Sequence, residues 1–262
     1  MTESTTKTEN KVADMAPLVR RVREFLDGRK KQTTVVEKPI GAVTLAGEFG
    51  FTEKKKGKPE VILSEDTAVE LGHPSTASKH ILLVTFQSEL INNGRISIVG
   101  PNLDALDGSK KHPFAQVIMI AAYPGRAPDP FELDNAQFLM HRLPGYMVRS
   151  VPGRLWVRIS DAGRAKELTL KTVGSALIAA YMGDFEGVAG AEVVFVTSSD
   201  EDVETLSRVA TEAEILSGRH KKLVLGVDGE VECTELNCDT CDEQETCDSL
   251  RDVVIKRRKR RK

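Results

Sequence analysis

Hydrophobic residues in the first half of the chain recur with two different spacings, which predict one helix followed by strands. Between Pro17 and Gly28 they recur every three or four positions. Because proline favours the first turn of a helix and glycine ends one, this segment is predicted to be a short docking helix. Runs of β-branched and aliphatic residues, separated by proline and glycine, predict strands at residues 33–45, 60–63, 68–71, 81–86 and 96–99.

The second half of the chain alternates between strand-like and helix-like spacing. Strands are predicted at residues 116–122, 154–159 and 192–196, and helices at 131–143, at 170–181 and after a cap at Ser199 or Asp200. The Asp228-Gly229 pair is a hairpin signal between residues 222–227 and 230–233, so Cys233 is predicted to end a strand. The predicted fold class is α+β, a mixed sheet with packed helices, plus a small C-terminal cysteine-rich metal-binding loop.

The domain organisation follows from these elements and from a change in composition near the C-terminus. The last seven residues are all lysine or arginine. Such a run predicts either a solvated, frayed tail or a segment that docks on an acidic partner. We divide the chain into an N-terminal tail and docking helix at 1–30, an α+β scaffold domain at 31–230, a four-cysteine metal module at 231–255 and a basic tail at 256–262.

Length, charge and apolar content limit the classes of function. The 262 residues, 40% of them hydrophobic, are enough for a sizeable core. The net charge of -2 gives no field that would attract a polyanion, so nucleic acid is not an expected partner. The longest apolar run, at residues 173–182, is shorter than the about 20 residues that span a bilayer. The polar start lacks a secretory signal, so we expect no membrane segment and a cytoplasmic location.

Four cysteines, the only ones in the chain, lie within fifteen residues: Cys233, Cys238, Cys241 and Cys247. In a reducing cytoplasm, their spacing C-x4-C-x2-C-x5-C is more typical of a metal site than of disulfides. Because all four come from one continuous loop rather than from two separated pairs, an iron–sulfur cluster, preferably [4Fe-4S], is favoured over zinc. Structural zinc and free or redox-sensing thiols stay open as alternatives.

A second candidate site lies in the predicted strand that contains the only tryptophan. In a strand, Arg154, Trp156 and Arg158 project to the same side. An indole can stack on a planar ring while two guanidinium groups hold phosphates, an arrangement that suits a nucleotide-like ligand. The alternative is an amphipathic outer face on which the indole packs against the arginine stems.

No motif of a conventional enzyme accompanies these sites. The five histidines are scattered without the spacing of a metal-binding pair, and the sequence has neither a G-x-S-x-G nor a phosphate-binding glycine loop. A hydrolase, kinase or nicotinamide dehydrogenase is therefore not expected, and no catalytic residue is assigned.

Four short stretches occur in an order that resembles a known family. They are SEDTAVELG at 64–72, GRISIVGPNLD at 94–104, RLWVRIS at 154–160 and VTSSDEDV at 196–203. Over residues 60–205 the chain resembles the middle region of the acetyl-CoA synthase (beta) subunit of the CO dehydrogenase/acetyl-CoA synthase complex. The resemblance implies an α+β scaffold and protein subunits of a larger complex as partners.

In that family the middle domain has an arginine-rich surface with a tryptophan, considered a coenzyme A site. By resemblance, Arg154, Trp156 and Arg158 would occupy that place and bind coenzyme A. The family's nickel–iron–sulfur centre also needs a Cys-Gly-Cys element, which this sequence lacks, so we expect no catalysis by the chain alone. The hypothesis is an iron–sulfur accessory or electron-transfer subunit of an anaerobic one-carbon complex. The alternative is a zinc-stapled, non-redox binding or assembly module.

Overall fold

A computed structural model describes residues 12–37, 61–135, 140, 143–151, 154–217, 223–225 and 231–233. The chain divides into two compact units, residues 1–217 and 218–262. The helices of the first unit are α1 (Ala16–Gly28), α3 (Pro130–Asn135), α4 (Asp161–Ala165), α5 (Leu170–Asp184), α6 (Asp200–Thr205) and α7 (Ser207–Leu216). Short 3₁₀ helices lie at Lys30–Gln32, Ser64–Asp66, Ser88–Leu90 and Leu103–Ala105.

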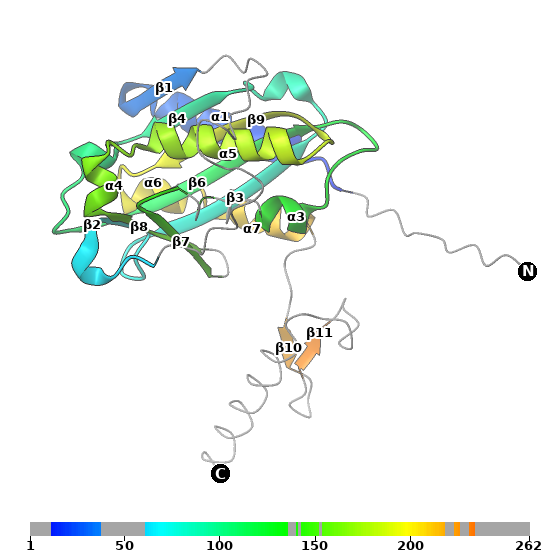
Figure 1. The fold of residues 1–262 in the computed structure, drawn as a ribbon. Helices are drawn as coiled ribbons and strands as arrows, with labels where there is room; N and C mark the ends of the chain where they lie inside the picture. Colours follow the sequence, from blue (N-terminus) through cyan, green and yellow to red (C-terminus); the bar gives the residue numbers. More distant parts are fainter. Residues whose placement is uncertain are drawn as a thin grey trace, which may run out of the picture. The chain divides into compact units, whose positions relative to one another are not determined.

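The described strands of the first unit form a large sheet and a small sheet (Figure 1). The large sheet has the order β1-β4-β9-β6-β3, with bounds β1 Thr33–Glu37, β4 Arg95–Val99, β9 Val188–Val196, β6 Phe114–Ala122 and β3 Ser78–Thr85. The small sheet has the order β5-β2-β8-β7, with bounds β5 Lys111–His112, β2 Thr67–Leu71, β8 Arg154–Ser160 and β7 Tyr146–Val151. Both sheets combine parallel and antiparallel pairs, which confirms the predicted α+β fold with mixed sheet.

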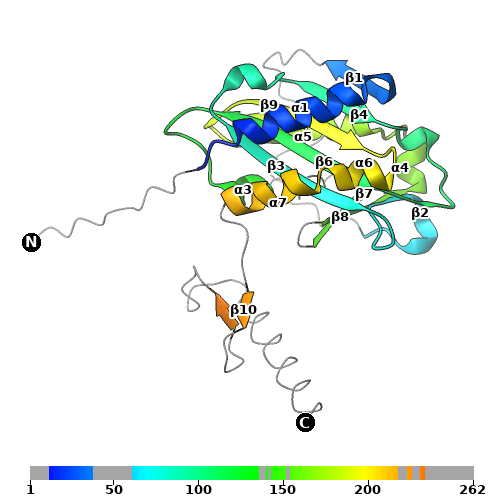
Figure 2. The same cartoon turned by 180° about the vertical axis from the view of Figure 1, so that it is seen from behind.

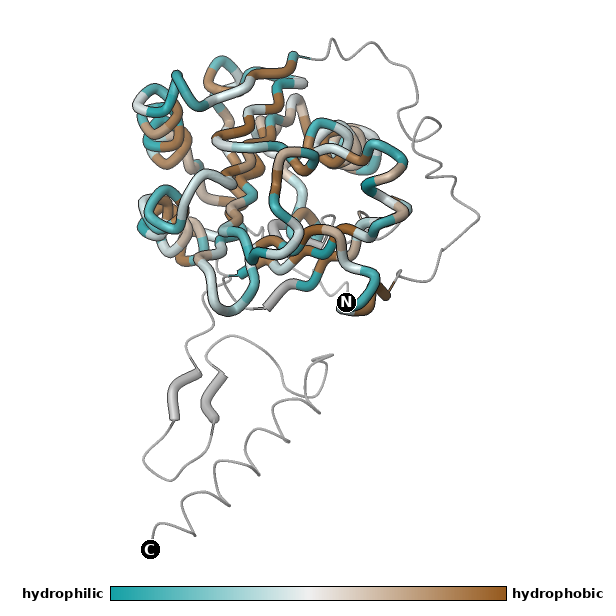
Figure 3. The backbone as a smooth tube through the Cα atoms, turned by 90° about the vertical axis from the view of Figure 1, so that its left-hand side faces the viewer, coloured by the Kyte–Doolittle hydropathy of each residue, from teal (hydrophilic) through white to brown (hydrophobic). Residues whose placement is uncertain are grey.

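The large sheet is covered on both faces. Helices α1, α6 and α7 lie on one face, and α5 lies on the other (Figures 1 and 2). Its inner strand β6 is buried at every position, as its sequence FAQVIMIAA predicts for a strand with packing on both sides. Figure 3 shows the same arrangement, since the hydrophobic colour concentrates along the strands between the helices.

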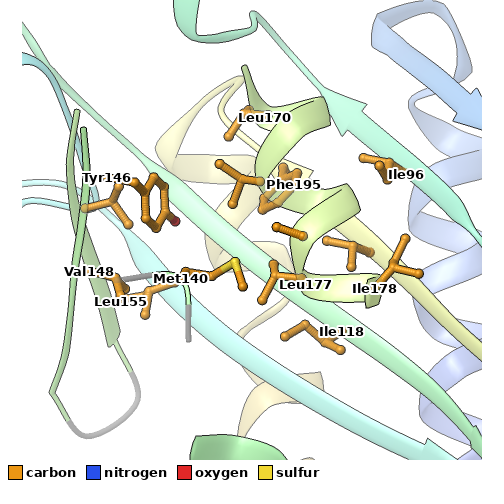
Figure 4. Packing of buried hydrophobic residues seen from close by; sticks show 14 of the residues in the cluster. Ile96, Ile118, Met140, Tyr146, Val148, Leu155, Leu170, Leu177, Ile178 and Phe195 are labelled. Carbon is orange, nitrogen blue, oxygen red and sulfur yellow. The ribbon is translucent and has the colours of Figure 1, made fainter. Parts of the chain in front are cut away.

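The small sheet packs one of its faces against the hydrophobic core. Tyr146 and Val148 of β7 and Leu155 of β8 project toward α5 and the large sheet, where they join the same hydrophobic cluster as Leu177 and Ile118 (Figure 4). The opposite side of β7 and β8 therefore points away from this core, because successive side chains in a strand alternate between its two sides.

Helix α1 lies where the sequence predicts a helix between Pro17 and Gly28. Its residues Leu18, Val22 and Phe25 are buried against the large sheet. The helix is also held by a buried ion pair, because the Arg23 guanidinium donates to both carboxylate oxygens of Glu192, which is fully buried in β9. Hydrophobic contact and charge pairing thus fix the same helix.

Most of the predicted strands and helices are found. The differences are one predicted strand that is absent and three elements, β5, β7 and α4, that were not predicted. The prediction of a strand at residues 60–63 was wrong for the described part, since residues 61–63 belong to no strand. Strand β7 was not predicted, because it lies between Pro144-Gly145 and Pro152-Gly153, which are typical of turns. The predicted helix at 131–143 is confirmed as α3 up to Asn135, but its predicted last residue, Leu143, lies in a bend. Residues 136–139, 141–142 and 38–45 lie outside the described ranges.

The second unit contains the predicted hairpin. Strand β10 (Leu223–Leu225) pairs antiparallel with β11 (Val231–Cys233), and Leu223 lies opposite Cys233. The first cysteine therefore ends a strand, as predicted. Cys238, Cys241, Cys247 and the basic tail lie outside the described residues.

Within the described ranges, no helix is both long enough and apolar enough to cross a membrane.

Candidate functional site

Strand β8 separates apolar from polar side chains. Leu155, Val157 and Ile159 are fully buried, whereas Arg154, Trp156 and Arg158 are only partly buried. The prediction that these three residues share one side of a strand is confirmed. That side faces away from the core, so the only tryptophan of the chain lies on the outer face of the small sheet.

The centre of this outer face is Glu70 of β2, which the sequence analysis did not single out. Its carboxylate is almost fully buried, with 2% of the residue exposed. The Trp156 Nε1–H donates to Glu70 Oε1 at 2.7 Å, and the Arg158 Nε–H donates to the same oxygen at 3.1 Å. Lys111 of β5 donates to Glu70 Oε2. One carboxylate therefore accepts from two cations and the indole.

The strand register explains this convergence. Glu70 pairs with Lys111 on one side and with Arg158 on the other, so the three residues form a row across β5, β2 and β8. Residues directly opposite each other in neighbouring strands point to the same side of a sheet. The opposite charges along this row therefore lie within reach of one another.

The indole of Trp156 is held on several sides. The Arg158 Cζ lies 4.5 Å from the ring centroid, a distance typical of a cation–π contact. The His73 ring meets the indole edge-on, with centroids 6.4 Å apart. Among the residues that the structure describes, no second guanidinium or aromatic ring stacks on the indole. Trp156 is thus oriented, with one of its faces covered by Arg158.

Residues 61–63 run along one end of this face. The Ile62 N–H donates to the Met147 Sδ at 3.4 Å, and the Ile62 carbonyl accepts from the Arg158 guanidinium at 3.1 Å. Ile62 is buried, while its neighbours Val61 and Leu63 are 63% and 51% exposed. The side chains of the sheet, rather than a neighbouring strand, satisfy this segment, which is why it is not a strand.

Arg154 has a different role from that of Arg158. Its guanidinium donates to the His73 and Thr76 carbonyls at 3.0 and 2.5 Å. These carbonyls lie in the connection between β2 and β3, so Arg154 holds that connection against β8. Part of its hydrogen-bonding capacity is therefore already used within the protein.

Arg149 of β7 adds a further cation. It lies opposite Trp156 in the strand register, and its side chain is exposed. Within the described ranges no hydrogen bond or ion pair engages it. We call Lys111, Arg149, Arg154, Trp156 and Arg158, with Glu70 at their centre, the cationic face. It combines an ordered aromatic ring with an excess of positive charge.

Tyr146 lies behind the cationic face, in the hydrophobic core. Burial raises the pKa of its hydroxyl well above the usual range. Its Oη has no hydrogen-bond partner among the described residues. A neutral phenol in this position contributes to packing, and it does not reach the cationic face, since it projects from the other side of the sheet.

The predicted four-cysteine module begins at the hairpin of the second unit. Of the four cysteines, Cys233 lies within the described residues, at the end of β11. The structure therefore leaves the four-cysteine site as a prediction.

Comparison with known proteins identifies the family. Residues 55–203 match the family model described as CO dehydrogenase/acetyl-CoA synthase complex beta subunit, which is more than half of the chain. The chain belongs to this family, and the predicted resemblance is confirmed. The cationic face lies entirely within the matched residues.

The individual relatives carry the same description. The acetyl-CoA decarbonylase/synthase complex subunit beta of Archaeoglobus fulgidus is 25% identical over 171 residues, 62% of this chain and 31% of the relative. The subunit beta of Methanopyrus kandleri is 26% identical over 55% of this chain and 31% of the relative. Subunit beta 2 of Methanosarcina mazei is 24% identical over 60% and 33%. The chain spans about a third of the length of the curated relatives it matches.

Proposed function

We propose that this chain is an accessory subunit of a complex of the CO dehydrogenase/acetyl-CoA synthase type, and that its cationic face binds coenzyme A. The observation that carries the proposal is the ordered indole of Trp156 among four cations, within the region that matches the family. An aromatic ring beside several cations suits a ligand that joins a planar base to phosphates.

The adenine ring of coenzyme A would lie against the indole, and its phosphates would lie among the cations. Base–aromatic stacking contributes about 1–3 kcal/mol. Arg154 and Arg158 already donate to protein oxygens, whereas Arg149 has no such partner among the described residues. Arg149 is therefore the residue from which we expect the largest phosphate contact.

The cysteine module is the second part of the proposal. Cys233, Cys238, Cys241 and Cys247 would hold an iron–sulfur cluster, preferably [4Fe-4S], that transfers electrons within the complex. The spacing from a single loop supports this proposal, as does the hairpin that ends at Cys233. A colourless, zinc-stapled assembly module is the alternative.

The family's nickel–iron–sulfur centre does not fit the residues present. The resemblance requires a Cys-Gly-Cys element, and these 262 residues contain none. An accessory role is consistent with that donor set, because it needs no catalytic metal in this chain.

Anaerobic purification followed by iron, sulfide and zinc analysis tests the metal module. We expect iron and acid-labile sulfide in stoichiometric amounts, and a brown colour that dithionite bleaches. Stoichiometric zinc without sulfide would replace the electron-transfer role with the assembly module.

Calorimetric titration with coenzyme A tests the cationic face. Arg149→Ala should weaken binding by about tenfold, because it removes a charge-assisted contact to phosphate. Arg208→Ala is the matched control, since Arg208 is exposed on α7, which packs on the other face of the large sheet. Equal affinities for the two variants would exclude Arg149 from the site.

A further inference from the structure

The buried carboxylate of Glu70 has an unexpected position for a face that binds anions. It accepts from Trp156, Arg158 and Lys111 at the centre of the cationic face. A negative charge at this place repels an incoming phosphate. It also pairs with two of the cations that would otherwise attract one, and offsets one unit of their positive charge.

Glu70 nevertheless organises the part of the face that recognises a ring. Its bond to the indole Nε1–H fixes the rotation of Trp156. The same oxygen accepts from the Arg158 Nε–H, and this guanidinium lies over the indole. Removing the carboxylate would therefore loosen the indole while releasing Lys111 and Arg158 for anions.

We propose that Glu70 is the specificity-determining residue of the cationic face. It favours a ligand that carries both a planar base and phosphates, and it disfavours small inorganic anions. Specificity of this kind needs an element that acts against the wrong ligand as well as contacts that attract the right one. Glu70 supplies the first by its charge and the second through Trp156. The inference rests on the proposed function, because it concerns the same face.

Glu70→Gln separates these two effects. Glutamine keeps the size and can accept from the indole N–H, but it lacks the charge that binds Lys111 and Arg158. Titrations with coenzyme A and with inorganic pyrophosphate give the ratio of the two affinities. We expect the preference for coenzyme A to fall by about tenfold, chiefly because pyrophosphate binds more tightly. Glu186→Gln, which changes an exposed carboxylate after α5, should leave the ratio unchanged.

An unchanged ratio in Glu70→Gln would overturn the inference. If both affinities fell by the same factor, the ratio would be unchanged and the role of Glu70 would be structural alone. Far-ultraviolet circular dichroism checks whether Glu70→Gln folds. If it does not fold, Glu70→Asp is used to test the inference instead. Aspartate keeps the charge but is too short to reach all three donors. It should weaken coenzyme A binding and leave pyrophosphate binding as in the wild type. Any other pattern in Glu70→Asp would overturn the inference.

The proposed function and the role of Glu70 can fail separately. Wild-type protein that binds neither ligand would end the coenzyme A proposal. In that case Glu70→Gln would still support the role of Glu70 if it gained affinity for pyrophosphate, and would refute it if it did not.

Discussion

The two sheets of the first unit differ in how completely their second face is covered. Every position of β6 in the large sheet is buried, whereas β8 in the small sheet alternates between buried and partly buried positions. A continuous apolar run thus marks a strand packed on both sides, and alternation marks a strand with a free side. The candidate binding residues lie on that free side, where the core does not determine the choice of side chain.

The sheets also differ in how they hold charge. Glu192 in the large sheet has its side chain fully buried, with Arg23 as its partner, and this pair fixes a helix. Glu70 in the small sheet is as well buried but has partners that remain partly exposed, including Lys111, whose side chain is 43% exposed. The first arrangement lies in the interior and fixes a helix, and the second borders the surface.

The largest expected effect concerns the core of the large sheet. Phe195 is fully buried and stacks on Phe114 with ring centroids 5.9 Å apart. Phe195→Ala should lower the free energy of unfolding by about 3–5 kcal/mol. Trp156→Ala on the free side should lower it by about 1–2 kcal/mol. Urea unfolding followed by circular dichroism compares the two, and equal losses would remove the distinction between the sheets.

The next effect tests the buried ion pair. Arg23→Met leaves the Glu192 carboxylate uncompensated in the interior and should cost about 3 kcal/mol. Arg21→Met is the matched control on the same helix, because the Arg21–Glu212 pair is partly exposed on both sides. Arg21→Met should lower the free energy of unfolding by less than about 1 kcal/mol. Similar losses of stability for the two variants in urea unfolding would show that burial of Glu192 does not raise the cost of removing its partner.

A smaller effect depends on pH and concerns the helical layer of the large sheet. Burial raises the pKa of the Asp202 carboxyl, but hydrogen bonds from Arg29 and Ser198 outweigh it and hold the pKa below its usual range. A carboxyl whose pKa is lowered by folding contributes its full stability above its unfolded pKa. That contribution is lost as the pH falls through the folded pKa.

Asp202→Asn should therefore cost about 1–2 kcal/mol at neutral pH. The difference from the wild type should shrink below about pH 4, where the unfolded carboxyl begins to bind a proton. Unfolding curves at several pH values measure this difference. A difference that stays constant down to pH about 3 would contradict the lowered pKa.

The smallest effect has the opposite sign and lies on the buried side of the small sheet. Because the Tyr146 Oη has no partner among the described residues, Tyr146→Phe should raise the free energy of unfolding by up to about 1 kcal/mol. Thermal unfolding measures the change. A loss of stability would indicate that the hydroxyl is bonded after all.

Sequence pattern predicted the fold better than it predicted the site. The alternation in β8 was enough to place Arg154, Trp156 and Arg158 on one side of a strand. Glu70 could not be found in this way, because its partners come from the register between distant strands, which no local spacing encodes. The sequence therefore predicted the aromatic ring and two of the cations of the candidate site, but it did not predict the carboxylate of Glu70 that connects them.

The predicted strand at residues 60–63 failed for a related reason. Its residues are apolar enough for a strand, but the Ile62 N–H and carbonyl bond to side chains of Met147 and Arg158. Backbone groups need partners, and local composition does not say whether these are strands or side chains.

The central claim is that the cationic face binds coenzyme A, and the only tryptophan of the chain reports directly on that face. The most direct measurement is a titration of wild-type protein with coenzyme A while the fluorescence of Trp156 is followed. We predict a saturable change in emission at coenzyme A concentrations below about 1 mM. Unchanged emission throughout that range, together with no heat of binding, would contradict the account.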